Sequence, residues 1–240
     1  MATSNGAPGK PMKHVGLRMV LSFLLVASLP ALILFTSSGR LDWWEAWVMV
    51  GVMAVTTGAS RALIMKKQPD LVTERASWTK ASGAKAWDLK LMPFVAIYGP
   101  VLFWLGAGLD KRWNATPALP AWLEGAAFLI ILAGYAFSTW AFLENRFFAA
   151  VVRIQTDRGQ VVVQSGPYHF VRHPGYAGAV LGYLLTPVAL GALWAYVPGI
   201  LLIGAVVLRT ALEDRTLMAE LPGYQEYAQK TKWRLLPGVW

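Results

Sequence analysis

Residues 120–143 read PAWLEGAAFLIILAGYAFSTWAFL and contain a single charged residue, Glu124. A helix needs about 20 largely apolar residues to cross a bilayer, so this run is long enough to span one. Runs of the same character occur near 15–37, 43–65, 88–109, 176–193 and 195–212. The whole chain is 56% hydrophobic and 15% charged. The sequence therefore predicts an all-α integral membrane protein, a helical bundle of five to six transmembrane helices.

The last two runs are expected to form a tight helical hairpin that ends the bundle. The first of them, 176–193, is short and contains Pro187, and the turn at 195–198 carries no charge. At the other end of the chain, the basic residues before 15–37 resemble those of a signal peptide. That run is longer than the apolar core of a signal peptide, which has about 7 to 15 residues, so it is expected to be a helix.

Lysine and arginine are distributed unequally between the two sets of loops that these helices create. Seventeen fall in one set and three, Arg40, Lys111 and Arg112, in the other. Because cytoplasmic loops carry the excess of positive charge, we expect a multi-pass protein with both termini in the cytoplasm. We expect a bacterial inner membrane rather than the endoplasmic reticulum. This topology, together with anionic lipids, explains the formal net charge of +9, so nucleic acid is not an expected partner.

The segment GPYHFVRHPGYAG, residues 166–178, is explained neither by core packing nor by membrane insertion. It places two tyrosines, an arginine and a histidine directly before an apolar run. These residues are Tyr168, Arg172, His173 and Tyr176. A polar, aromatic and cationic cluster at the mouth of a membrane helix is costly unless it binds something. The segment is therefore a candidate binding site for a small, charged, partly aromatic ligand.

Pro174 favours a helix that begins near Pro174 or Gly175, with its free N–H groups at the cytoplasmic surface. Such a helix start can bind a carboxylate or a phosphate. Arg172 and His173 could add side-chain donors, the two tyrosines could stack on a purine or face a cation, and Gly175 allows close approach. Gly178 belongs to a GxxxG spacing, which helix packing explains at least as well as ligand contact.

Arg209 and Glu213 lie one helical turn apart at the far end of the predicted hairpin. A salt bridge between them is one interpretation, although the order Arg before Glu is the less favourable one. Glu213 and Asp214 are also expected near a helix C-terminus, where the macrodipole disfavours anions. The alternative is that Glu213 accepts hydrogen bonds from a ligand's hydroxyl or ammonium group. Arg209 would then be available to bind a second ligand's carboxylate bidentately.

Two short runs rich in β-branched residues, 151–155 and 161–164, flank the turn-forming sequence TDRG. This pattern predicts a short β-hairpin before the motif. Its backbone could contact a ligand at the membrane surface, or the segment could be a connector; the residues alone leave both interpretations open.

A metal site is not expected. The chain contains no cysteine, which removes thiolate ligands and disulfides. His169 and His173 have a helical metal spacing, but the residue before a proline avoids helical geometry, and Pro174 follows directly.

Three segments together resemble the isoprenylcysteine carboxyl methyltransferase family of integral membrane enzymes. They are GPYHFVRHPGYAG at 166–178, RTALEDRTL at 209–217 and GYQEYAQKTKWRLLPG at 223–238. The resemblance covers about 155–237, a third of the chain. It implies that S-adenosyl-L-methionine is the cofactor and that a cytoplasmic site in the C-terminal part holds it.

The resemblance also implies roles for individual positions. Cofactor contacts in the family match Gln155, Gln160, Val161, Val162, Val163, Tyr168, His173, Pro174, Gly175, Tyr176 and Glu213, to which the motif itself adds Arg172. An arginine that matches Arg209 holds the acceptor's carboxylate, so Arg209 is the expected catalytic residue. The chain departs from the family in having Asp214 where a second glutamate is frequent, and in a shorter turn before the motif.

The predicted organisation is a disordered tail at 1–14, a four-helix transmembrane region at 15–143 and a cofactor-binding, catalytic region with a transmembrane hairpin at 144–240. The resemblance implies methyl transfer to a lipophilic small molecule or lipidated substrate, most simply a carboxylate, in contact with membrane lipids. Three alternatives remain: an NADPH-dependent sterol-type reductase, a phospholipid amine N-methyltransferase, and a lipid-binding protein without enzymatic activity.

Overall fold

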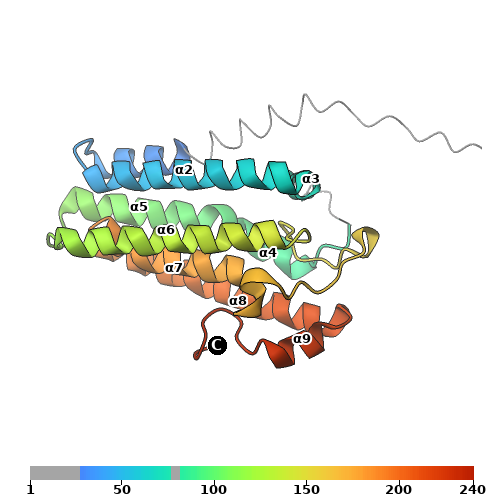
Figure 1. Ribbon diagram of the computed structural model, residues 1–240. Coiled ribbons are helices and arrows are strands. Elements are labelled where there is room, and N and C mark those ends of the chain that lie inside the picture. Colours follow the sequence, from blue (N-terminus) through green and yellow to red (C-terminus); the bar gives the residue numbers. More distant parts are fainter. Residues whose placement is uncertain (1–27, 77–81) are drawn as a thin grey trace, which may run out of the picture.

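The computed structural model describes residues 28–76 and 82–240, and within them the chain is helical and forms no strand. The long helices are α2 (Trp44–Lys67), α5 (Gly99–Trp113), α6 (Ala121–Glu144), α7 (Pro174–Ala189) and α8 (Tyr196–Glu220). Three shorter helices lie at one end of the bundle (Figure 1): α3 (Pro69–Ala76), α4 (Ala86–Pro93) and α9 (Tyr224–Lys230). A further helix, Ser28–Ser38, precedes α2.

Within the described residues, four helices are long and apolar enough to cross a membrane: Trp44–Lys67, Ala86–Trp113, Ala121–Glu144 and Leu193–Glu220. Only 11% to 33% of the apolar window in each is buried within the molecule, so each helix keeps apolar surface that the rest of the chain does not cover. Long helices with outward apolar surfaces are those of an integral membrane protein, which confirms the predicted class. The fifth predicted span, α7, has only 16 residues, and most of the run at 15–37 lies outside the described residues.

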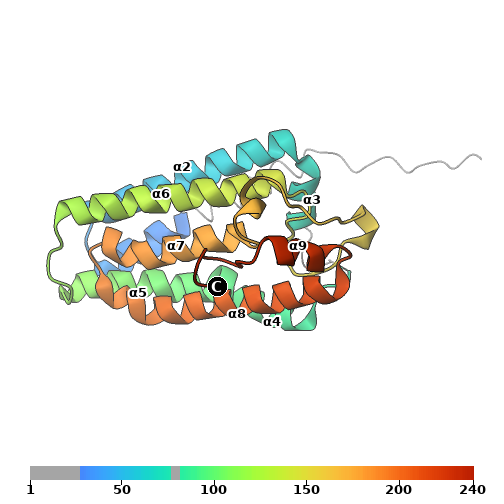
Figure 2. The ribbon, with the colours of Figure 1, turned by 60° about the horizontal axis from the view of Figure 1, so that its bottom comes forward.

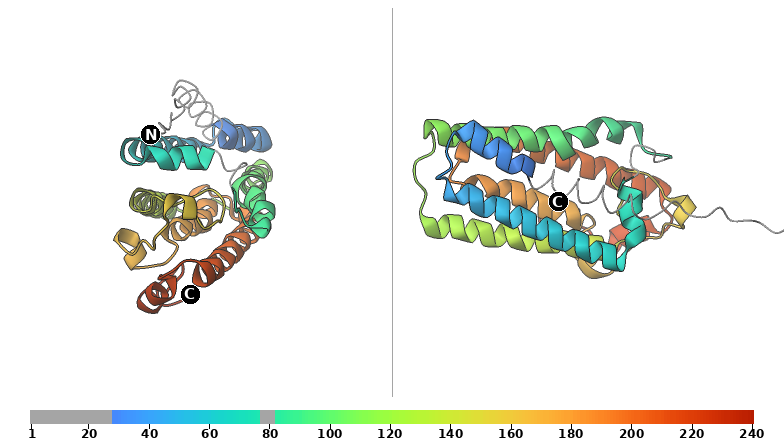
Figure 3. Two further views of the ribbon diagram at one scale, coloured as in Figure 1. Left: turned by 90° about the vertical axis from the view of Figure 1, so that its right-hand side faces the viewer. Right: turned by 90° about the horizontal axis from the view of Figure 1, so that it is seen from above.

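The bundle is layered when seen along its helices (Figure 3, left), with α2 on one side, α6 and α7 in the middle and α8 on the other side. Helices α6 and α7 approach closely at Gly178. A Cβ at this position would overlap the Gly134 carbonyl and the Ser138 hydroxyl of α6. Helix packing therefore accounts for Gly178. A turn at Gly191, whose φ is +56°, then leads towards α8 and completes the predicted helical hairpin.

The span Ala86–Trp113 is one continuous helix with an irregular turn inside it. Helix α4 ends at Pro93, residues Phe94–Tyr98 form a π-helix, and α5 follows. Proline has no N–H to donate to the preceding turn, so a local change of hydrogen-bond register is expected there. Val95 in the π-helical turn lines an internal cavity described below.

The predicted β-hairpin is wrong. Residues 151–164 form an irregular segment with a single 3₁₀ turn, Thr156–Arg158, closed by Gly159 at a φ of +60°. The reason is local: the side-chain oxygen of Gln160 accepts the backbone N–H of Gln155 at 2.7 Å. The backbone N–H of Gln160 donates to the Gln155 carbonyl at 3.1 Å, and together the two bonds close a turn from which no ladder extends along the two runs.

Helix α8 is longer than predicted, since it continues to Glu220 instead of ending near residue 212. Glu213 and Asp214 consequently lie inside the helix, well before its C-terminus. The helix macrodipole acts within the last turn and therefore does not disfavour these two anions, whose contacts decide their roles.

The C-terminal segment folds back from α9 along the bundle (Figure 2). The backbone N–H groups of Arg172 and His173 donate to the carbonyls of Trp233 and Arg234, each at 2.9 Å. Leu235 packs with Val171 and with Ala177 of α7. The tail motif and the 166–178 motif are thereby held together as one structural unit.

The structure allows the predicted orientation to be tested with introduced cysteines, because the chain has none of its own. Ala118, in the loop between α5 and α6, and Lys232, just after α9, are both exposed. That loop and α9 lie at opposite ends of the bundle (Figure 1). With the distribution of Lys and Arg as the guide, Lys232→Cys should react with a membrane-impermeant maleimide only after permeabilisation, and Ala118→Cys in intact cells. The reverse pattern would contradict the orientation.

Candidate functional site

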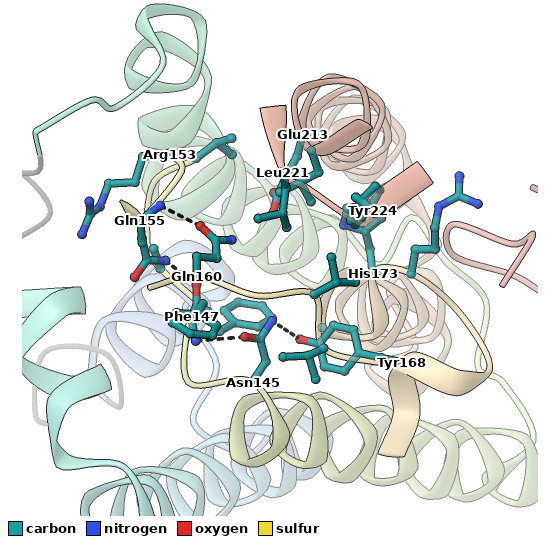
Figure 4. A pocket seen from close by; sticks show the side chains of 18 of the residues that line it. Asn145, Phe147, Arg153, Gln155, Gln160, Tyr168, His173, Glu213, Leu221 and Tyr224 are labelled. Atoms are coloured by element: carbon teal, nitrogen blue, oxygen red, sulfur yellow. Dashed lines mark hydrogen bonds between the residues drawn. The ribbon is translucent and has the colours of Figure 1, made fainter. Parts of the chain in front are cut away.

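A pocket opens at the end of the bundle where α7 begins, between α8, α9 and the irregular segment before α7 (Figure 4). It encloses about 80 Å³, and about 780 Å³ once the space open to solvent is included. All of the predicted cofactor residues except Pro174 line it, and so does Arg209. The other lining residues are Asn145, Phe147, Phe148, Ala149, Val151, Val152, Arg153, Leu217, Leu221, Tyr224 and Tyr227. The structure thus brings together residues from distant parts of the sequence. We call the pocket that they line the polar pocket.

Gln155 and Gln160 hold the wall of the polar pocket in place. Gln155 is 1% exposed and donates from its side-chain amide to the Phe147 carbonyl at 2.6 Å. Its side-chain oxygen accepts from Arg158 at 2.5 Å. Together with the bond from its backbone to Gln160, these contacts fold the segment into a rigid turn, along which Val161, Val162 and Val163 line the pocket.

Helix α7 begins at Pro174, which confirms the predicted helix start. The next residue, Gly175, packs against the ring of Phe148. A Cβ at this position would lie 2.6 Å from that ring. The absence of a side chain at Gly175 is therefore needed for packing of Phe148, whatever ligand lies nearby.

Tyr176 connects the start of α7 to α8. Its hydroxyl donates to Oε2 of Glu213 at 2.7 Å, and its ring lies 6.0 Å from that of His173 in a stacked orientation. The second carboxylate oxygen of Glu213 accepts no hydrogen bond from the described part of the chain, and the half-buried side chain lines the polar pocket. Glu213 can therefore accept a hydrogen bond from a ligand, while Tyr176 fixes its position.

Arg209 does not pair with Glu213. Its Nε and Nη2 donate to the two oxygens of Asp88 at 2.7 and 3.0 Å, and Nη2 also donates to the Ala150 carbonyl at 2.9 Å. Asp88 is fully buried and accepts the Val152 N–H at 2.7 Å as well. Among the described residues only Nη1 of Arg209 has no acceptor, so it can offer a ligand one nitrogen and not the full bidentate fork.

Sequence reasoning missed Asp88. The available signal was a lone carboxylate in the first turn of a long apolar run, where an unpaired charge is costly. Its partner is 121 residues away in the chain, so no local pattern could identify the pair.

Asp214 is the centre of a buried cluster of ion pairs. Its oxygens accept from Arg172 at 2.8 and 2.9 Å and from Arg234 at 2.8 Å, and they contact His173 at 3.1 Å and the Tyr224 hydroxyl at 2.9 Å. Burial disfavours the charge on Arg172, but its bonds to Asp214 outweigh this effect, and the pKa of Arg172 is raised. The cluster joins the 166–178 motif, α8 and the tail.

This arrangement changes the interpretation of Arg172 and His173. Both were expected to donate to an anionic ligand, and in the structure both face Asp214. Arg172 also donates from Nη1 to the carbonyls of Thr231 and Lys232 at 2.9 and 2.8 Å. The two side chains thus support the pocket wall. The backbone of Tyr168 is part of the same support, since its carbonyl accepts a hydrogen bond from the Tyr227 hydroxyl at 2.6 Å.

A second cavity of about 440 Å³ adjoins the polar pocket, and we call it the bundle cavity. It lies between α2, α6, α7 and α8, and it shares Phe148, Ala149, Gly175, Tyr176 and Arg209 with the polar pocket. Its volume falls within the range of about 300 to 1,000 Å³ that is typical of sites for small molecules. Two ligands, one from each side, could therefore meet at Tyr176 and Arg209.

Comparison with known families gives a match that covers most of the residues lining the polar pocket. Residues 126–219 match the model of the isoprenylcysteine carboxyl methyltransferase (ICMT) family. This confirms the resemblance predicted from the motifs. The match runs through α6, α7 and nearly all of α8, and so includes Tyr176, Arg209 and Glu213. A comparison with curated proteins gives no significant match.

The ICMT match and the apolar helices together indicate a membrane methyltransferase. Members of the ICMT family use S-adenosylmethionine as the methyl donor. Asp88, α3 and the tail motif lie outside the matched segment. The family match therefore says nothing about these parts, and their contacts in the structure show what they contribute to the site.

Proposed function

We propose that this protein transfers the methyl group of S-adenosylmethionine to a lipophilic acceptor that carries a carboxylate, such as an isoprenylcysteine-like group. One observation carries the proposal: the polar pocket and the bundle cavity meet at Tyr176 and Arg209. A water-soluble donor entering from the end of the bundle and a lipid-borne acceptor entering between the helices would meet there.

The polar pocket fits a ligand with a base, a cation and hydroxyl groups. Aromatic rings of Phe147, Tyr168, Tyr176 and Tyr224 line it and can pack against a flat base or face a sulfonium. The open oxygen of Glu213 can accept from an ammonium or a hydroxyl group. We infer that these residues and the 161–163 backbone would hold S-adenosylmethionine.

When bound, S-adenosylmethionine supplies an electrophilic methyl group on a positively charged sulfur. A carboxylate oxygen of the acceptor would take this methyl group, and the carbon–sulfur bonding pair would stay with sulfur as a neutral thioether. A carboxylate is already a nucleophile, so no proton has to be removed. The residues need to orient the two reactants and exclude water.

The direct test is methyl transfer by the purified protein in detergent or lipid. Labelled S-adenosylmethionine is offered with prenyl thioether carboxylic acids, phospholipid amines and neutral lipids in parallel. Label in an ester that alkali releases supports the proposal. Label found only in phospholipid amines would instead assign amine methylation, and no transfer to any acceptor would contradict both.

Tyr176 gives the first specific prediction. Replacing it with alanine removes a pocket ring and the hydroxyl that positions Glu213, and it should weaken S-adenosylmethionine binding by about 1 to 3 kcal/mol. Isothermal titration of the purified variant measures the effect, and Glu213→Ala should weaken binding as well. Tyr196→Phe, which alters a hydroxyl bound to the Leu184 carbonyl at the opposite end of the bundle, is the control. Unchanged affinity in both pocket variants would contradict the assignment.

A further inference from the structure

Arg75 lines the bundle cavity from α3, a helix outside the ICMT match. Helix α3 is firmly attached: Leu71 is fully buried, and the side chain of Gln68, just before the helix, donates to the Leu143 carbonyl of α6 at 2.7 Å. Hydrogen bonds also fix the guanidinium of Arg75: its Nη1 donates to the Phe148 and Ala149 carbonyls at 3.2 Å each. Its position in the cavity wall is therefore well defined.

The remaining donors of Arg75 are available. Nε and Nη2 have no hydrogen-bond acceptor within 28–76 and 82–240, and neither atom is among the buried groups without a partner. These atoms are therefore not sealed within the protein, and Arg75 lines the bundle cavity, where a ligand could accept from them. The rings of Phe142 and Phe148 lie 5.0 and 5.7 Å from its Cζ and cover part of its surface.

The charge of Arg75 is also not balanced locally. Arg61, Arg75 and Arg209 line the bundle cavity, and no carboxylate of the described chain does so. Asp88 neutralises Arg209, whereas Arg75 has no carboxylate partner in the described residues. Burial lowers the pKa of Arg75 to about 10, so the group still carries its charge at neutral pH.

We propose that Arg75 binds the anionic headgroup of the methyl acceptor and so selects lipophilic carboxylates over lipophilic amines. The proposal rests on the proposed function, which it deepens. Arg209 can offer a ligand only Nη1, so a carboxylate at the junction of the two cavities needs a second cation. Arg75 supplies a charge and three N–H donors in a preorganised position. The same charge repels an ammonium headgroup, which gives selectivity by repulsion as well as by attraction.

The test uses equilibrium binding of a prenyl thioether carboxylic acid, its primary amide and the corresponding amine to the purified full-length protein in detergent. Arg75→Gln should weaken binding of the acid about tenfold to a hundredfold, the usual effect of losing a charge-assisted hydrogen bond. Binding of the amide should change less than about twofold. Arg75→Lys keeps the charge and should recover part of the affinity for the acid. Arg146→Gln, an exposed cation at the same end of the bundle, is the control.

A purely structural role of Arg75 gives a different pattern. Acid and amide would then weaken together, and the affinity for S-adenosylmethionine and the melting temperature would fall with them. Unchanged acid binding in a folded Arg75→Gln variant would also overturn the proposal. If Arg75→Gln does not fold, the comparison of acid and amide binding in Arg75→Lys decides, because only the acid should be affected.

The outcomes separate this proposal from the proposed function. Acid binding that depends on Arg75 in a protein that transfers no methyl group would keep the anion site and reject the reaction. Methyl transfer to the acid with a KM that does not respond to Arg75→Gln would keep the reaction and reject the role of Arg75.

Discussion

Arg209→Lys should lower the turnover of methyl transfer to a lipophilic acid about a hundredfold, because a misplacement of about 1 Å at a reacting centre can have an effect of that size. Lysine keeps the charge but lacks the planar fork that places Nε and Nη2 against the two oxygens of Asp88, with Nη2 also on the Ala150 carbonyl. The segment that carries Ala150 and Val152 then loses one of its attachments, and the junction of the two cavities changes shape.

Three measurements on one preparation of Arg209→Lys separate the possible causes. The dissociation constant of S-adenosylmethionine should stay within a few fold of the wild-type value, while kcat falls and the protein remains folded by its melting temperature. Arg215→Lys, an exposed position on the same helix, should behave as wild type. Full activity of Arg209→Lys would contradict the role of this pair in the reaction, and lost cofactor binding would move Arg209 to the cofactor site.

Asp214→Asn should cause a large loss of stability. Asp214 is 2% exposed and binds two arginines, and breaking a buried ion pair on one side is expected to cost about 3 to 5 kcal/mol. Arg172 and Arg234 would be left without their carboxylate, and the tail would lose its attachment to α8.

Thermal unfolding in detergent measures this loss, with Asp157→Asn as the matched control. Asp157 also pairs with an arginine, but its side chain is 61% exposed, so its removal should change stability by less than about 1 kcal/mol. Equal melting temperatures for the two variants would contradict the assignment of Asp214 as a structural centre. Retained stability with lost cofactor binding would make Asp214 a ligand contact.

Local patterns predicted the membrane class, the long apolar helices and the start of α7. Runs of apolar residues report spans directly, and Pro174 marks a first helical turn because its missing N–H costs nothing there. The same kind of pattern failed at 151–164, where β-branched residues predicted strands. The buried amide of Gln155 holds a turn there instead, and a propensity scale cannot register a side-chain contact of that kind.

The residues around the polar pocket were predictable as a set, but their individual roles were not. The motifs identified which residues gather there, since all but Pro174 line it. Arg172 and His173 were expected to contact a ligand, and their actual partner, Asp214, is 42 and 41 residues away. Asp88 and Arg75 carry no motif at all. They reach the site through the packing of α4 and α3, which only the folded chain shows.

Equilibrium binding of S-adenosylmethionine and of NADPH to the same purified protein tests the proposed methyl transfer at its first step. We expect saturable binding of S-adenosylmethionine that its demethylated product displaces and that Tyr176→Ala weakens, with no saturable binding of NADPH. Binding of NADPH in place of S-adenosylmethionine would rule out the proposed methyl donor and indicate a membrane reductase. Binding of neither, by a protein shown to be folded, would leave a lipid-binding protein without this chemistry.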